Sequence, residues 1–167
     1  MGGVNTLQWL ADKYRLDLTR PKMPIPIPNV GRNNLAEWCR ELGFARIVEV
    51  GVRRGEYTEV LARTNAQATV YGVDPWEVYP GYLDGMKINT REKVESDYGA
   101  AVSRLSPYGN CQLIRGFSSR AARYFGRESI DCVYIDANHA REAVLEDIGL
   151  WLPLIRRGGI ISGHDYK

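Results

Sequence analysis

The chain has 167 residues, of which 44% are hydrophobic and 25% are charged, a composition typical of one ordinary globular domain. Its formal net charge of +2 is too small to indicate a nucleic acid or an anionic membrane as a partner. No apolar stretch approaches the roughly 20 residues of a membrane span. Cys39, Cys111 and Cys132 are isolated, which predicts buried thiols in a reducing, cytoplasmic compartment.

Residues 1–34 are predicted to form a separate N-terminal segment. A short helix is expected at residues 7–18, and a run of prolines then favours a stiff, extended arm. Such an arm usually lies across a surface or reaches a partner subunit. Asn33 or Asn34 would cap a following helix, which leads into a main domain expected to cover residues 35–167.

Strand and helix patterns alternate through this main domain. The expected strands lie at residues 46–50, 68–73, 111–115, 130–136 and 160–162, the last preceded by a turn at Gly158 and Gly159, and the expected helices at 56–65, 90–105, 118–125 and 140–152. Such alternation predicts right-handed βαβ units and an α/β fold, with a Rossmann-like, mainly parallel sheet and helices on both faces. Ligands on such sheets bind beyond the carboxyl ends of the strands.

A glycine-containing turn follows the first expected strand. Residues 49–55 read Glu-Val-Gly-Val-Arg-Arg-Gly and connect an apolar run to a helical pattern. Glycines let a ligand approach the backbone closely, and a helix N-terminus presents free N–H groups, so this turn predicts a site for a nucleotide-like cofactor. Asp74 ends the next strand about 20 residues further on, where an acid is suited to bind ribose hydroxyls.

Five motifs occur in order along the chain. They are Glu49-x-Gly51-x-x-x-Gly55, Gly72-Val-Asp74-Pro-Trp76, Gly116-Phe-Ser118, Asp131-x-Val-Tyr-Ile-Asp136-x-Asn-His139, and Pro153-x-x-x-x-Gly158-Gly159-Ile-x-x-Gly-His164-Asp165-Tyr166. The ordered set resembles the class I S-adenosylmethionine (SAM)-dependent methyltransferases. Within them it looks like the small-molecule O-methyltransferase branch that includes the macrocin and sugar O-methyltransferases. Dinucleotide dehydrogenases instead prefer G-x-G-x-x-G, which differs from the spacing found here.

The resemblance implies a role for each motif in binding SAM. The methionine moiety would contact Glu49, Gly51 and Gly55, the ribose Asp74, the adenine Pro75, Trp76, Phe117 and Ser118, and the sulfonium end Asp136. A second interpretation of Asp136 is a plain N-cap for the helix that follows it.

The resemblance also implies a metal site and a catalytic base. Metal-dependent members bind Mg²⁺ or a similar ion with an acid after strand four and a pair after strand five, and those positions here are Asp136, His164 and Asp165. Carboxylates suit a hard divalent ion, whereas histidine favours Mn²⁺, Fe²⁺ or Zn²⁺. His139 stands where catechol-type relatives carry a lysine base, and it would take the acceptor proton beside Asp136. The alternatives are a solvated turn at His164-Asp165 and a backbone hydrogen bond for His139.

These features predict a SAM-dependent methyltransferase that moves a methyl group to a hydroxyl of a small molecule, with a divalent ion as a candidate second cofactor. The alternatives are a non-catalytic SAM- or nucleotide-binding module that acts through a partner, and a dinucleotide-dependent oxidoreductase. The chain supplies five strands, whereas family members continue to a seven-stranded sheet, so we expect a fragment whose fifth strand is an edge. Another subunit or the N-terminal arm would otherwise cover that edge, and a homo-oligomer would form through either.

Overall fold

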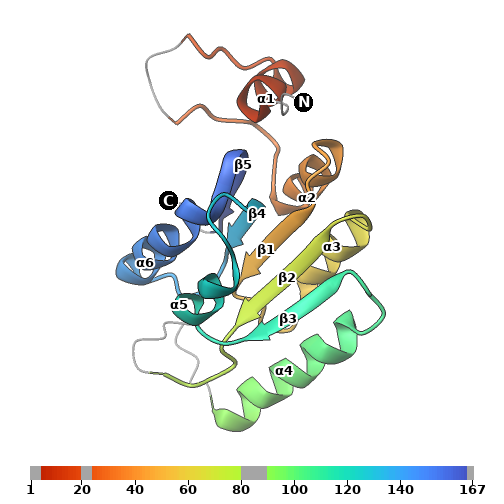
Figure 1. Ribbon diagram of the computed structural model, residues 1–167, viewed down its shortest axis with the longest axis vertical. Helices are drawn as coiled ribbons and strands as arrows, with labels where there is room; N and C mark the ends of the chain where they lie inside the picture. The colour runs from red at the N-terminus through yellow and green to blue at the C-terminus, as the bar shows by residue number, and fades with distance from the viewer. Residues whose placement is uncertain (1–4, 20–23, 80–89, 165–167) are drawn as a thin grey trace.

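The computed structural model of the protein describes residues 5–19, 24–79 and 90–164, and strands and helices alternate along the chain (Figure 1). The helices are α1 (Thr6–Tyr14), α2 (Arg32–Glu41), α3 (Glu56–Thr64), α4 (Arg91–Leu105), α5 (Ser118–Ala121) and α6 (Arg141–Trp151), with short 3₁₀ turns η1 (Ala122–Tyr124) and η2 (Leu152–Leu154). The strands are β1 (Arg46–Val50), β2 (Thr69–Asp74), β3 (Cys111–Arg115), β4 (Ile130–Ile135) and β5 (Ile155–Gly163).

The five strands form one parallel sheet in the order β3-β2-β1-β4-β5. Glu49 in β1 lies level with Gly72 on β2 and with Tyr134 on β4. The chain therefore moves from β1 to one side of the sheet, through β2 and β3, and then to the other side through β4 and β5. This reversal creates a switch point between the carboxyl ends of β1 and β4, where ligands bind on such sheets. The predicted Rossmann-like fold is confirmed.

Helices cover both faces of the sheet, which explains why all of β4 and all of β1 except Arg46 are buried. On one face, Leu35 of α2 and Leu61 of α3 belong to the same buried cluster as Ile47 of β1. On the other face, where α5 and α6 lie side by side (Figure 1), Trp151 of α6 packs with Val133 of β4. All of these side chains are buried, so the sheet is held as a rigid platform for its carboxyl edge.

The N-terminal segment packs against the rest of the chain. The Thr6 hydroxyl donates a hydrogen bond of 2.5 Å to the Gly158 carbonyl on β5, and the Trp38 indole donates one of 2.8 Å to the Tyr14 hydroxyl. The predicted helix at residues 7–18 is too long, because α1 ends where Arg15 adopts a left-handed conformation with φ of 53°. The prediction that Asn33 or Asn34 is the N-cap of α2 is also wrong, because Gly31 takes that position.

Gly31 is the N-cap of α2, and its N–H donates a 2.9 Å hydrogen bond to the side chain of Asn34. Asn34 therefore caps from inside the helix rather than from its start. The expected strand at 160–162 is likewise too short, because β5 begins at Ile155 and includes both Gly158 and Gly159. The predicted turn takes the form of a bulge inside the strand, because the register shifts between Ile130 and Cys132 and Gly158 has a φ of 75°, which glycine adopts without strain.

Two further expectations need correction. The segment at 118–125 is not one helix but the short α5 followed by the 3₁₀ turn η1. Cys39 and Cys132 are buried as predicted, whereas Cys111 is only half-buried. Among the described residues, no helix is long and apolar enough to cross a membrane.

Candidate functional site

A cavity of about 440 Å³ opens at the carboxyl ends of β1, β2 and β4. This volume lies within the range of about 300–1,000 Å³ that is usual for small-molecule sites. Most of the predicted site residues line it: Glu49, Gly51, Asp74, Pro75, Trp76, Asp136 and His139. Because the carboxyl ends of parallel strands meet at one edge of the sheet, residues that are scattered along the sequence lie together in this cavity.

Gly51 joins the ends of three neighbouring strands. Its N–H donates to the Val73 carbonyl at 2.8 Å, and the N–H of Asp136 donates to the Val50 carbonyl at 2.7 Å. Gly51 has a φ of 95°, and a Cβ at this position would lie 2.2 Å from the carbonyl oxygen of Asp136. Glycine is therefore required here by the approach of the protein's own backbone. Gly55, the other predicted glycine of this turn, is the N-cap of α3 and is not among the residues that line the cavity.

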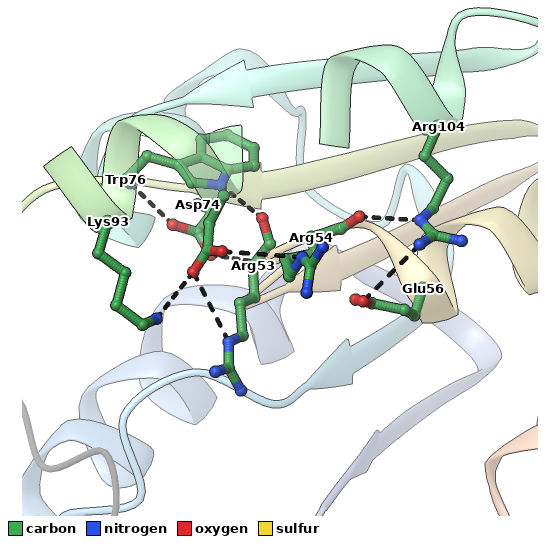
Figure 2. Close-up of polar contacts among 8 residues, drawn as sticks. Arg53, Arg54, Glu56, Asp74, Trp76, Lys93 and Arg104 are labelled. Atoms are coloured by element: carbon green, nitrogen blue, oxygen red, sulfur yellow. Dashed lines mark hydrogen bonds and ion pairs between the residues drawn. The ribbon is translucent and has the colours of Figure 1, made fainter. Parts of the chain in front are cut away.

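The Asp74 carboxylate fixes the turn that follows β1. Its Oδ2 accepts a 2.9 Å hydrogen bond from the Arg53 N–H, and its Oδ1 accepts a 2.7 Å bond from the Trp76 N–H (Figure 2). Burial raises the pKa of the Asp74 carboxyl, although these backbone bonds oppose the rise. A carboxylate has about four acceptor positions, so Asp74 keeps capacity for the hydroxyls of a ligand.

Trp76 packs into the protein beneath the cavity. Its indole N–H donates a 2.7 Å hydrogen bond to the Arg53 carbonyl, and its ring centroid lies 4.8 Å from that of Tyr98 on α4. Only 3% of Trp76 is exposed, so little of the ring is available to a ligand. The tryptophan therefore supports the Asp74 turn from below, and Pro75 presents the more accessible surface.

A cluster of charges, which the sequence did not indicate, joins the turn to α4. Asp97 lies 3.1 Å from the Lys93 ammonium and 3.8 Å from the guanidinium groups of both Arg53 and Arg54. Lys93 and Asp97 have the ordinary i,i+4 spacing of a solvated helix face, which carries no functional signal. Exposed ion pairs contribute little stability, so the main effect of this cluster is to position two arginines at the cavity wall.

Glu49 is a buried acid in the same cavity. It is 2% exposed, and its carboxyl group accepts a hydrogen bond from the Thr58 hydroxyl. Burial raises the pKa of Glu49 from 4.5 to about 8, with a smaller contribution from the nearby Asp136 charge. The group is therefore mostly protonated at neutral pH until a cation approaches it and favours ionisation.

Asp136 gathers three basic side chains around one carboxylate. Its Oδ1 lies 3.8 Å from Nε2 of His139 and 3.7 Å from Nδ1 of His164, and its Oδ2 lies 3.8 Å from a guanidinium nitrogen of Arg32. The structure thus brings together Asp136, His139 and His164. Arg32 was missed because nothing in the sequence marks the start of α2 as part of the site.

Arg32 is held over the Tyr57 ring at 5.2 Å, and its carbonyl accepts a hydrogen bond from the Tyr57 hydroxyl. The predicted metal ligand Asp165 lies outside the described residues. Within the described ranges, no group of three or more His, Cys, Asp or Glu side chains is arranged to hold a metal ion.

A smaller cavity of about 170 Å³ adjoins the first and shares Gly51 and Pro75 with it. The remaining predicted cofactor residues, Phe117 and Ser118, line this second space at the start of α5. Asp147 of α6, which was not predicted, also lines it. Together the two cavities are lined by the buried carboxyl groups of Glu49 and Asp147 and by aromatic rings that include Tyr79 and Phe117.

The sequence model of a family described as "Methyltransferase domain" matches residues 48–166. The matched range begins at Val48 within β1 and includes β2 to β5, with the strand ends that form the site. No curated protein matches the chain in sequence.

Solved structures share the fold at low sequence identity. The O-methyltransferase TomG from Streptomyces achromogenes, involved in tomaymycin synthesis and solved in complex with SAM, is 19% identical, with a TM-score of 0.55 over 93% of this chain and 62% of its own. An O-methyltransferase from Bacillus cereus in complex with SAH is 17% identical, with a TM-score of 0.59 over 98% of this chain and 67% of its own.

An rRNA methylase from Streptococcus thermophilus is also similar, with 20% identity and a TM-score of 0.56 over 80% of this chain and 69% of its own. The chain therefore spans about two thirds of the length of these structures. Identities this low show a shared fold and leave the methyl acceptor to be argued from the site itself.

Proposed function

The chain belongs to the methyltransferase domain family, and from this membership we propose that it transfers the methyl group of SAM to a hydroxyl of a small molecule. The observation that carries the proposal is the cavity at the strand switch point, where Asp74 keeps free acceptor capacity beside the turn that follows β1. The SAM and SAH bound to two of the similar structures support the choice of cofactor.

The residues present fit the chemistry of SAM. Asp74 suits the ribose hydroxyls, and the buried carboxyl of Glu49 suits the cationic end of the cofactor, because a nearby cation favours the ionised form of an acid. The second cavity, whose wall includes Pro75 and the ring of Phe117, suits the base. SAM, when bound, supplies an electrophilic methyl group on a sulfonium, and the protein then has to orient the acceptor and exclude water.

His139 is the proposed proton acceptor for the substrate hydroxyl. The positive charge of the donor disappears during transfer, so the protein gains most by positioning the acceptor and removing its proton. Asp136, 3.8 Å from Nε2 of His139, would stabilise the imidazolium that forms. Both residues are on the cavity wall, which is consistent with this role.

A divalent ion is a separate proposal. Asp136 and His164 present an oxygen and a nitrogen 3.7 Å apart, and Asp165 would add a further carboxylate. Such a mixed set suits Mn²⁺, Fe²⁺ or Zn²⁺ better than Mg²⁺. If an ion takes part, EDTA will abolish activity and one of these metals will restore it, whereas equal activity with and without EDTA removes this proposal.

The acceptor class and the cytoplasmic location are likewise proposals. A net charge of +2 supports a small molecule over an RNA, in contrast to the rRNA methylase of similar fold. The cysteines, which form no disulfide among the described residues, support a reducing compartment.

The first test is thermal unfolding with SAM, SAH and NAD in parallel, because a ligand of the folded state raises the apparent stability. We expect SAM and SAH to raise the melting temperature and NAD to leave it unchanged. The reverse pattern would identify an oxidoreductase. Incubation with methyl-labelled SAM and a pool of small hydroxylated metabolites then tests catalysis, and SAM binding without any labelled product would favour a non-catalytic module.

A further inference from the structure

The second cavity contains a buried acid that the proposed mechanism does not use. Asp147, in the second turn of α6, is 7% exposed and lines the wall of this space. Burial raises the pKa of this carboxyl group, and the side chain of Ser118, the first residue of α5, acts in the opposite direction. Burying a carboxyl group is costly unless it finds polar partners, and a carboxylate has about four acceptor positions that a bound ligand could use.

The wall of this cavity carries hydrogen-bond acceptors but no cationic side chain among its described residues. Its described wall contains the acids Glu146 and Asp147 and the hydroxyls of Ser118 and Ser119, but no Lys, Arg or His side chain. Such a wall accepts hydrogen bonds readily and offers no cation to an oxygen-rich or anionic group. The rings of Phe117 and Tyr79, whose centroids lie 5.2 Å apart, add an aromatic surface.

The cavity lies where a nucleoside base would be expected. It shares Pro75 with the larger cavity, and Pro75 immediately follows Asp74, the proposed ribose ligand. A base linked to a ribose at Asp74 would reach this space with its flat faces toward apolar side chains. Its polar edge would then meet the buried carboxyl group of α6.

We propose that Asp147 is a specificity residue that selects adenine by accepting a hydrogen bond from the exocyclic amino group of the base. Ser118, on the wall of the same cavity, would help to orient the carboxylate. A hypoxanthine base carries a carbonyl oxygen in place of that amino group. This oxygen and the Asp147 carboxylate are both hydrogen-bond acceptors, so they would repel each other instead of forming a hydrogen bond. The inference rests on the proposed function, because it takes the adenosyl cofactor as the ligand.

Asp147 also has a purely structural interpretation, in which it only ties α6 to the start of α5. The two roles differ in what they change. A structural role would lower stability and weaken all ligands equally, whereas a specificity role changes the ratio between two ligands that differ at one edge of the base. The ratio is therefore the decisive measurement.

The experiment compares S-adenosylhomocysteine with its deaminated analogue S-inosylhomocysteine by calorimetry, in the parent protein and in Asp147→Asn. We expect the parent to prefer the adenosyl ligand by roughly tenfold to a hundredfold, the value of a hydrogen bond to a charged group. In Asp147→Asn the preference should shrink at least about tenfold, since a side-chain amide also donates to a carbonyl oxygen.

Two further variants make the test robust. Ser118→Ala should reduce the preference partially, because the carboxylate loses its anchor, and it provides a second route if Asp147→Asn fails to fold. Glu142→Gln, which removes an exposed carboxylate from the same helix, should leave the preference unchanged. An unchanged preference in both Asp147→Asn and Ser118→Ala, with adenosyl binding intact, overturns the specificity role and leaves the proposed function standing. If the parent binds neither ligand, both proposals fall.

Discussion

The Arg53 N–H donates a 2.9 Å hydrogen bond to the Asp74 carboxylate, so the turn after β1 and the tip of β2 form one structural unit. The two residues are 21 positions apart in sequence, and α3 lies between them. The same carboxylate also accepts from the Trp76 N–H. Asp74 therefore organises the protein wall of the cavity as well as offering acceptor positions to a ligand, and its replacement has two separable effects.

The first prediction concerns Asp74→Ala. Loss of the carboxylate should weaken SAM and SAH binding by roughly 1.5–3 kcal/mol, the range of a hydrogen bond to a charged group. It should also destabilise the protein by about 1–3 kcal/mol, because two backbone N–H groups lose their acceptor. Calorimetric titration measures the first effect and urea unfolding the second. Asp12→Ala, at an exposed aspartate on α1, is the control. Unchanged SAM affinity would show that Asp74 is not a cofactor ligand.

The second prediction concerns Gly51. In Gly51→Ala, the new Cβ would lie 2.2 Å from the Asp136 carbonyl oxygen at a φ of 95°. Either the β1 turn or the start of the loop after β4 has to move, so we expect destabilisation by roughly 3–5 kcal/mol and loss of cofactor binding. Gly99→Ala is the matched control, because Gly99 lies exposed in α4 with nothing within 4 Å of a new Cβ.

Gly99→Ala should stabilise the protein by about 0.5–1 kcal/mol, the difference in helix propensity between alanine and glycine. Denaturant unfolding of both variants measures these values. A Gly51→Ala protein with parental stability would mean that the contact between Gly51 and the Asp136 backbone relaxes easily.

The β-strand pattern and the order of motifs were predictable because each strand is a short apolar run between turn residues. β1 and β3 have the predicted bounds, and the convergence of Glu49, Asp74 and Asp136 followed from parallel strands alone. Periodicity fixes which face of a helix is buried, but not where the last turn ends, and this explains the error in α1.

The contributions of Arg32, Asp97 and Asp147 could not be predicted for a different reason. Each is a charged residue on a helix, where the sequence pattern matches an ordinary solvated face. Their positions in the cavity walls depend on how α2, α4 and α6 pack on the sheet, which no local pattern records. The sequence indicated that position 51 needs a glycine so that a ligand can approach the backbone. The structure gives a different reason, because the group that approaches Gly51 is the backbone carbonyl of Asp136.

The third prediction uses the buried acid Glu49, whose pKa is raised from 4.5 to about 8. Between these values the unfolded chain has released the proton that the folded protein keeps. The unfolded state thus binds fewer protons, and the free energy of unfolding falls as pH rises. The stabilising contribution is complete below pH 4.5 and is lost by about pH 8.

Glu49→Gln removes this titration while its amide oxygen still accepts the Thr58 hydroxyl. We expect the variant to gain stability relative to the parent as pH rises through this window, by an amount on the order of a few kcal/mol. Urea unfolding of the two proteins at several pH values measures the difference. Thr58→Val, which removes the hydrogen-bond donor, should instead raise the pKa further and extend the window. Parallel pH profiles for parent and Glu49→Gln would show that Glu49 is ionised in the folded protein.

The fourth prediction distinguishes two roles for the histidines beside Asp136. Nε2 of His139 and Nδ1 of His164 lie 3.8 and 3.7 Å from the same carboxylate oxygen, so geometry alone does not separate a base from a metal ligand. If His139 is the base, His139→Ala should lower kcat by roughly 10²–10⁴-fold and leave the Kd for SAM nearly unchanged. Added imidazole should then restore part of the activity, because it replaces the missing proton acceptor.

If His164 binds an ion, His164→Ala should instead raise the metal concentration needed for half-maximal activity, and imidazole should not rescue it. Full activity of His139→Ala in a methyl-transfer assay with labelled SAM would assign the proton to another acceptor, and a normal metal response in His164→Ala would remove this histidine from the metal proposal.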